Sequence, residues 1–90
     1  MFNIKIKRKT LRKLTKLDQK RKKIIEQTVS ILKQNPIPFR KTDVSKLKGY
    51  DNMYRIRIGD LRIVYEVLWT PKTILIHYIG PREKAYRKTL

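Results

Sequence analysis

Cysteine is absent from this chain of 90 residues, and acidic residues are scarce. Without cysteine the chain has neither disulfides nor thiolate metal ligands. A single histidine, His77, argues against a metal site built from imidazoles. No apolar run reaches the length of a transmembrane helix, and no signal-peptide pattern follows the first residue. We therefore expect a cytoplasmic protein without metal or cofactor, and a single domain over residues 1–90.

The shortage of acids leaves a large positive charge. There are 24 Lys+Arg against 7 Asp+Glu, which gives a net charge of +17. Such a charge repels itself and attracts polyanions, so nucleic acid is the first partner to expect and an anionic membrane surface the second. Adaptation to heat usually enriches glutamate together with lysine, whereas acids are scarce here. Heat adaptation is therefore the weaker explanation of this charge.

Many of the cations crowd the first quarter of the chain. A solvated helix face would have the same composition, so this block indicates a polyanion rather than a reaction. As RNA or ribosome contacts we predict Lys5, Lys7, Arg8, Lys9, Arg12, Lys13, Lys16, Lys20, Arg21, Lys22 and Lys23.

Apolar spacing predicts one strand followed by two helices. Residues 2–6 alternate between apolar and polar side chains, which is typical of a strand. Leucine recurs every third position over residues 11–17 and predicts a short helix with Thr10 as its cap. Asp18 breaks this spacing and is expected to cap a longer helix, which ends before Pro36. The apolar face of that second helix is Ile24, Ile25, Val29, Ile31 and Leu32.

The second half of the chain has the spacing of a sheet. Residues 39–53 are predicted to be a connector that docks on the core through Val44 and Leu47. A hairpin follows, then a turn at residues 70–72 and a last strand stopped by Gly80-Pro81. The order β-α-α-β-β-β predicts an α+β fold with two helices on one face of a four-stranded, largely antiparallel sheet. The opposite face is then free.

The hairpin carries three arginines on one side. With Gly59-Asp60 as a two-residue turn, Arg57 faces Arg62, and Arg55 shares their side of the sheet. This side is expected to stay exposed, and like charges opposite one another cost stability. The cluster therefore indicates a ligand with several negative charges, RNA first. Ion pairs with Glu66 and the acids of the connector are the alternative.

Three more residues are candidates for chemistry. If residues 82–86 form a turn of helix, Arg82 and Tyr86 share one side of it. Taken alone, the pair is weak evidence, and surface packing is the more common reason for such a pair. His77 is the only side chain that titrates near neutral pH. Strand alternation groups His77 with Ile79, and Tyr78 with the isoleucines on the other side. Whether His77 or Glu66 takes part in catalysis stays open.

Four short motifs resemble the RelE family of toxins from toxin–antitoxin pairs, within the RelE/ParE superfamily, and its archaeal members in particular. The motifs are Lys46-Leu47-Lys48-Gly49, Tyr54-Arg55-Ile56-Arg57, Leu61-Arg62-Ile63-Val64-Tyr65 and Gly80-Pro81-Arg82-Glu83. Together with the element order, the resemblance covers nearly the whole chain. It adds Lys46 and Lys48 to the expected ribosome contacts.

The resemblance implies cleavage of messenger RNA in the A site of a 70S-type ribosome, by attack of the 2′-hydroxyl on the adjacent phosphate without a metal ion. It implies Arg62 and Arg82 as phosphate and transition-state contacts and Tyr86 as the aromatic residue near the 3′ end. Well-known bacterial members carry lysine at the positions of Arg55 and Arg57. Arginine keeps its proton, so here these two residues supply charge and the general base is unassigned.

The resemblance also implies a partner, an acidic antitoxin of the RelB kind that wraps the toxin, and a free toxin that is monomeric. Two other functions stay open. A ParE-like inhibitor of DNA gyrase would share the fold, although such proteins generally lack the basic catalytic cluster. A non-catalytic ribosome- or RNA-binding module would have no cleavage to lose when Arg82 is replaced.

Overall fold

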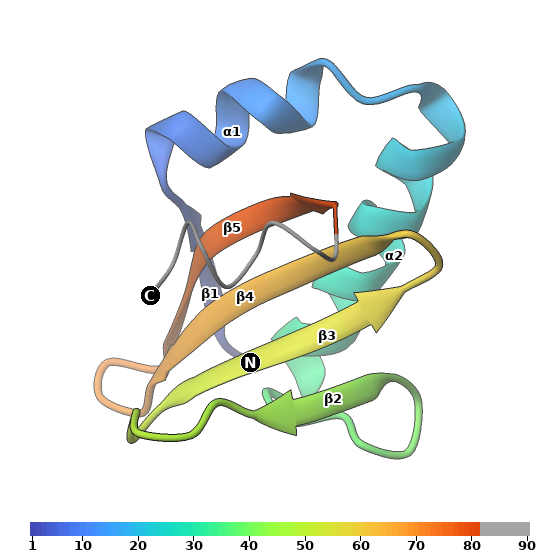
Figure 1. The fold of residues 1–90 in the computed structure, drawn as a ribbon. Coiled ribbons are helices and arrows are strands. Elements are labelled where there is room, and N and C mark those ends of the chain that lie inside the picture. The colour runs from blue at the N-terminus through green and yellow to red at the C-terminus, as the bar shows by residue number, and fades with distance from the viewer. Residues whose placement is uncertain (82–90) are drawn as a thin grey trace.

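The computed structural model describes residues 1–81, and its strands form one mixed sheet (Figure 1). The strands lie side by side in the order β1-β5-β4-β3-β2. β1 runs parallel to β5, and the other neighbours are antiparallel, so the predicted α+β class and largely antiparallel sheet are confirmed. The elements, in chain order, are β1 (Asn3–Ile6), α1 (Arg8–Thr15), α2 (Gln19–Gln34), β2 (Asp43–Lys46), β3 (Met53–Ile58), β4 (Leu61–Leu68) and β5 (Thr73–Pro81).

The sheet has five strands, one more than predicted. The extra strand is β2, which lies inside the predicted connector and pairs with β3. Its sequence alternates over only four residues and has a charge at each end, which is too short a pattern to predict a strand. Val44 packs against the main core as predicted, whereas Leu47 belongs to a smaller cluster on the opposite face of the sheet.

Both predicted helices form, but their predicted caps are wrong in detail. Thr10 is the third residue of α1, and its buried hydroxyl donates to the His77 carbonyl oxygen at 2.7 Å. Asp18 does stand at the N-cap position of α2, yet its carboxylate accepts from Arg21 instead of from the backbone. In each case a tertiary or charged partner replaces the local bond on which a cap depends. Neither helix, the only two in residues 1–81, is long and apolar enough to cross a membrane.

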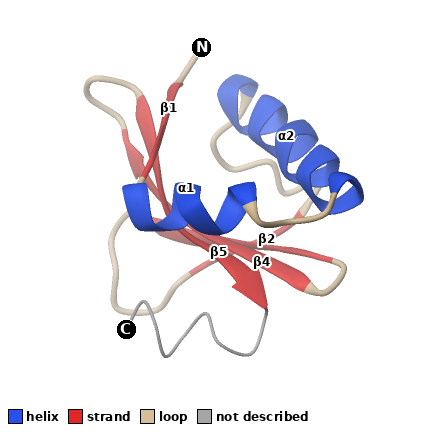
Figure 2. Cartoon of the chain, turned by 90° about the horizontal axis from the view of Figure 1, so that it is seen from above, coloured by secondary structure: helices blue, strands red, loops and turns tan. Residues whose placement is uncertain are grey.

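The main core lies between the helices and the inner face of the sheet. In Figure 1, α2 runs behind the strands and α1 lies above β5, and Figure 2 shows α1 crossing in front of the strands. Tyr65 is fully buried there, and its hydroxyl donates to the Pro36 carbonyl oxygen at 2.7 Å, which ties the end of α2 to the sheet. The buried members are Ile25, Leu32, Ile56, Leu61, Ile63, Tyr65, Val67, Ile74, Ile76 and Ile79.

The pairing of β4 with β5 shifts by one residue. Val64 pairs with Tyr78, whereas the next residue of β4 pairs with Ile76, so His77 is an extra residue in β5. Beyond this bulge the alternation is inverted: Ile79 faces the main core, and Tyr78 faces outward. The predicted grouping of Tyr78 with the isoleucines, and of Ile79 with His77, is therefore wrong.

The last strand is also longer than predicted. Gly80 and Pro81, expected to stop it, pair with Arg62 and Leu61 of β4. β1 pairs with β5 only as far as Ile76, so the missing N–H of proline interrupts no ladder on that side.

Candidate functional site

The arginine hairpin forms with the predicted register. Gly59, with a φ of 57°, occupies the left-handed region that the tight turn requires, and Arg57 lies directly opposite Arg62. Arg55, Arg57 and Arg62 therefore share the side of the sheet that faces away from α2. We call this side, over β3, β4 and the end of β5, the arginine face (toward the viewer in Figure 1).

Arg57 is held by an acid of β2. Asp43 pairs with Arg57 in the sheet, and the Arg57 Nε donates to the Asp43 Oδ2 at 3.1 Å. This carboxylate offsets part of the repulsion between Arg57 and Arg62. The alternative explanation of the arginine cluster, ion pairs with nearby acids, thus holds for Arg57, which pairs with an acid of the connector. It does not apply to Glu66, which contacts His77.

Arg62 is buried, with 6% of its surface exposed, so the expectation that the whole arginine side stays exposed is wrong. The reason is a small apolar cluster on the same face, made by Leu47, Met53, Val64 and Tyr78. Val64 follows Arg62 by two residues on the strand, and Tyr78 is close enough for the charge of Arg62 to act on the pKa of its hydroxyl. A guanidinium shielded from water attracts an anion more strongly than an exposed one does.

Arg55 is half-buried and carries a buried nitrogen. Its Nη1 has no hydrogen-bond partner among residues 1–81. Leaving a buried donor unsatisfied costs about 1–3 kcal/mol, and more for a charged group. A phosphate oxygen is an acceptor that would offset this cost, and guanidinium groups bind phosphate in a bidentate way.

Tyr78 borders the arginine face, and the sequence reasoning missed it because the register shift is invisible in the alternation. Its hydroxyl donates to the Pro81 carbonyl oxygen at 3.2 Å, and its ring crosses Gly80. Burial raises the pKa of Tyr78, while the charge of Arg62 acts to lower it. From α1, the Lys13 Nζ sits 5.1 Å from the centre of the ring.

His77 and Glu66 form a second polar contact on the outer side of the sheet. The His77 Nε2 and the Glu66 Oε1 are 3.0 Å apart, and both side chains are partly exposed. Glu66 and Arg62 stand on the same strand with Val64 between them. The apolar cluster thus separates this pair from Arg62, so the structure does not bring it together with the buried arginine.

The predicted basic block lies on the surface of β1, α1 and α2. Arg21 is engaged there: its guanidinium donates to Asp60 at 2.6 Å and to Asp18 at 3.1 Å. Arg21 also lowers the pKa of Asp60. Arg21 and Lys22 are half-buried. The exposed members are Lys5, Lys7, Arg8, Lys9, Arg12, Lys13, Lys16, Lys20 and Lys23, together with Lys46 and Lys48 near β2. Arg82 and Tyr86 lie outside the described residues.

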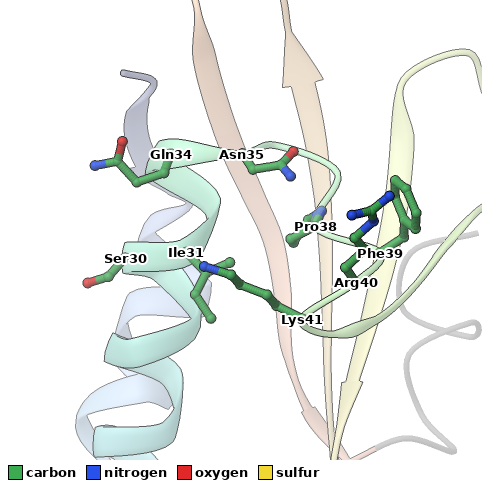
Figure 3. Close-up of a pocket in the computed structure, with 8 residues that line it drawn as sticks. All are labelled: Ser30, Ile31, Gln34, Asn35, Pro38, Phe39, Arg40 and Lys41. Atoms are coloured by element: carbon green, nitrogen blue, oxygen red, sulfur yellow. The ribbon is translucent and has the colours of Figure 1, made fainter.

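A groove of about 470 Å³ lies apart from the arginine face, between the end of α2 and residues 38–41 (Figure 3). Ile31 and Pro38 line its apolar part. Phe39 is 69% exposed, and the Arg40 guanidinium carbon sits 5.9 Å from the centre of its ring. Of the predicted catalytic residues that the structure describes, Arg55, Arg57 and Arg62, none lines this groove.

Comparison with known proteins gives consistent matches over most of the chain. A family model described as the ParE toxin of the type II toxin–antitoxin system, parDE, matches residues 4–86. The chain is 42% identical over 86 residues to the "Putative toxin RelE1" of Methanocaldococcus jannaschii, with 96% of each chain covered.

Solved structures agree with this. An archaeal RelE–RelB complex from Pyrococcus horikoshii matches with a TM-score of 0.81 and 34% identity, over 90% of this chain and 94% of that one. A RelB–RelE antitoxin–toxin complex from Methanococcus jannaschii matches with a TM-score of 0.75 and 26% identity, over 91% and 94%.

Proposed function

The chain belongs to the ParE/RelE family of toxins from type II toxin–antitoxin systems, and from this premise we propose that it is a ribosome-dependent endoribonuclease. It cleaves messenger RNA in the ribosomal A site and thereby stops translation. The observation that carries the proposal is the arginine face. Arg57 and Arg62 lie opposite each other in the sheet, and the buried Nη1 of Arg55 lies on the same side.

The proposed reaction is transesterification without a metal ion. The 2′-oxygen attacks the adjacent phosphorus, the bond to the 5′-oxygen breaks, and a cyclic phosphate and a 5′-hydroxyl result. Negative charge builds on the phosphate oxygens in the transition state, and donors held in place stabilise it. Arg55, Arg57 and Arg62 supply such donors, with Arg57 oriented by Asp43. The resemblance adds Arg82 to this set and Tyr86 beside it.

Dependence on the ribosome follows from what arginine cannot do. A guanidinium keeps its proton near neutral pH, so the three arginines stabilise charge without abstracting a proton. Alignment of the 2′-hydroxyl with the scissile bond then has to supply much of the rate, and the ribosome can provide that alignment. Free RNA is therefore expected to be cut poorly.

The partner we propose is an acidic antitoxin of the RelB kind. The chain carries a net charge of +17, and most of its N-terminal cations are exposed. An acidic chain would neutralise this surface and compete with RNA for it. The similar archaeal structures are themselves complexes of RelE with RelB.

Primer extension on messenger RNA programmed into ribosomes tests the proposal. We expect wild type to cut at one position in the A-site codon, and Arg57→Ala, Arg62→Ala and Arg82→Ala to lose at least about 100-fold in rate, the loss typical of removing one transition-state donor. Lys33→Ala is the matched control, because Lys33 is an exposed cation in the last turn of α2. Thermal melting checks that each variant folds. If removal of buried Arg62 prevents folding, the half-buried Arg57 decides the matter.

Four outcomes would contradict the proposal. Absence of any position-specific cut by wild type would exclude the nuclease, and equal rates on naked RNA would exclude ribosome dependence. Variants that co-sediment with ribosomes while wild type cuts nothing would indicate the binding module. Inhibition of gyrase supercoiling by wild type would favour the ParE-like function.

A further inference from the structure

The proposed reaction lacks a proton donor for its leaving group among the arginines of the described site. When the bond to the 5′-oxygen breaks, that oxygen takes the electron pair and needs a proton. Guanidinium groups release protons too reluctantly to provide it, whereas an ammonium group can. The following inference rests on the proposed function and concerns Lys13, an amine that α1 brings to the arginine face.

The fold brings Lys13 to that face along an unpaired edge of the sheet. β1 pairs with β5 only as far as Ile76, so the second half of β5 has an open edge. α1 takes up this position (Figure 1): the Thr10 hydroxyl donates to the His77 carbonyl oxygen at 2.7 Å. Residues three apart share one side of a helix, so docking at Thr10 directs Lys13 toward the same strand.

Tyr78 is the residue that both Lys13 and Arg62 approach. The bulge at His77 turns the Tyr78 ring to the outer face, where the Lys13 Nζ lies 5.1 Å from its centre. Such a distance is typical of a cation–π contact. The ring extends along the strand across Gly80, which pairs directly with Arg62. Lys13 and Arg62 thus both border one buried ring.

We propose that Lys13 is the general acid of the cleavage reaction. In this step the 2′-hydroxyl gives its proton to a water molecule and its oxygen bonds to phosphorus. The bond between phosphorus and the 5′-oxygen breaks, and the 5′-oxygen takes its electron pair and a proton from the Lys13 ammonium. Water then reprotonates the amine. Arg62 holds the phosphate while Tyr78 fixes the direction of the ammonium.

A change of leaving group tests this role. Ribosomes are programmed with messenger RNA that carries, at the cut position, either the natural 5′-oxygen or a bridging 5′-sulfur, which leaves without protonation. Single-turnover rates are measured for wild type, Lys13→Ala, Lys13→Arg and Lys33→Ala. On the oxygen substrate we expect Lys13→Ala and Lys13→Arg each to lose about 100- to 10,000-fold, the range for an acid–base group. On the sulfur substrate both should come within a few-fold of wild type.

Lys33→Ala removes the same charge from an exposed position in the last turn of α2, so it reports a general loss of positive charge. It is expected to cut both substrates at rates near wild type. The inference is overturned if Lys13→Arg matches wild type, since charge alone would then suffice, or if Lys13→Ala loses equally on both substrates. Failure of wild type to cut either substrate would instead overturn the proposed nuclease.

Discussion

At the scale of single residues, Gly80 shows how closely the arginine face is packed. A Cβ atom built there would lie 2.6 Å from the Tyr78 Oη and 2.9 Å from its Cζ, closer than carbon atoms approach. Glycine is thus required by the neighbouring ring, which also holds Lys13 and borders Arg62.

Gly80→Ala is therefore expected to destabilise the protein by about 1–3 kcal/mol, the usual cost of overpacking. In a Tyr78→Ala background, with the ring removed, the same change should cost little, because alanine is otherwise preferred to glycine within a strand. Urea denaturation of the four proteins in the cycle measures the coupling. An equal cost in both backgrounds would show that the ring is not the obstacle.

At the scale of elements, one ion pair joins α2 to the tip of the arginine hairpin. The Arg21 guanidinium reaches Asp60 in the turn and Asp18 at the start of its own helix. These groups are largely exposed, so the contribution to stability is modest and sensitive to salt. The ion pair matters more for position, because it connects the hairpin that carries the arginines to a helix behind the sheet.

The ion pair between Arg21 and Asp60 predicts that the stability of the fold depends on pH. Because Arg21 lowers the pKa of Asp60 in the folded state, the pair stabilises the fold above the unfolded pKa of about 3.9, and this contribution disappears as the pH falls through the lower folded value. Asp60→Asn should therefore be less stable than wild type at pH 6, and the difference should shrink toward pH 2.

Urea denaturation at a series of pH values measures that difference. Asp51→Asn, at an exposed acid in the turn before β3, is the matched control and should show a smaller effect at pH 6. A difference between Asp60→Asn and wild type that stays constant with pH would contradict the assignment.

At the scale of the whole molecule, the few acids are mostly engaged. Asp18, Asp43, Asp60 and Glu66 each contact an arginine or a histidine within the fold. Most lysines of α1 and α2 are exposed, and the whole chain has a net charge of +17. Self-repulsion at that charge destabilises the compact state and is relieved by screening.

Salt should consequently stabilise the free protein. Raising the NaCl concentration from 0.1 M to 1 M shortens the screening length from about 10 Å to about 3 Å. We expect Tm to rise, by about 4–8 °C for each kcal/mol of repulsion relieved. Reversing Lys9 and Lys23 to glutamate removes two charges at each position and lowers the net charge from +17 to +13, so this variant should show a smaller rise. A Tm that falls with salt would mean that the ion pairs outweigh the repulsion.

The short-range features of this protein could be predicted from its sequence. The helices, the two-residue turn at Gly59 and the shared side of Arg55, Arg57 and Arg62 follow from apolar spacing and turn chemistry, which act between residues close in the chain. The positive charge, and with it the attraction to polyanions, is a matter of composition alone. The resemblance to RelE toxins was also visible in short motifs.

Other features depend on contacts between residues far apart in the chain. The pairing that makes β2 a strand, the bulge at His77, the burial of Arg62 and the approach of Lys13 to Tyr78 are all of this kind. An extra residue in one strand inverts its alternation only when a partner strand fixes the register, so no local pattern predicts it. For that reason the sequence could place three arginines on one face, whereas only the folded sheet and α1 could bring a lysine to the ring of Tyr78 on that face.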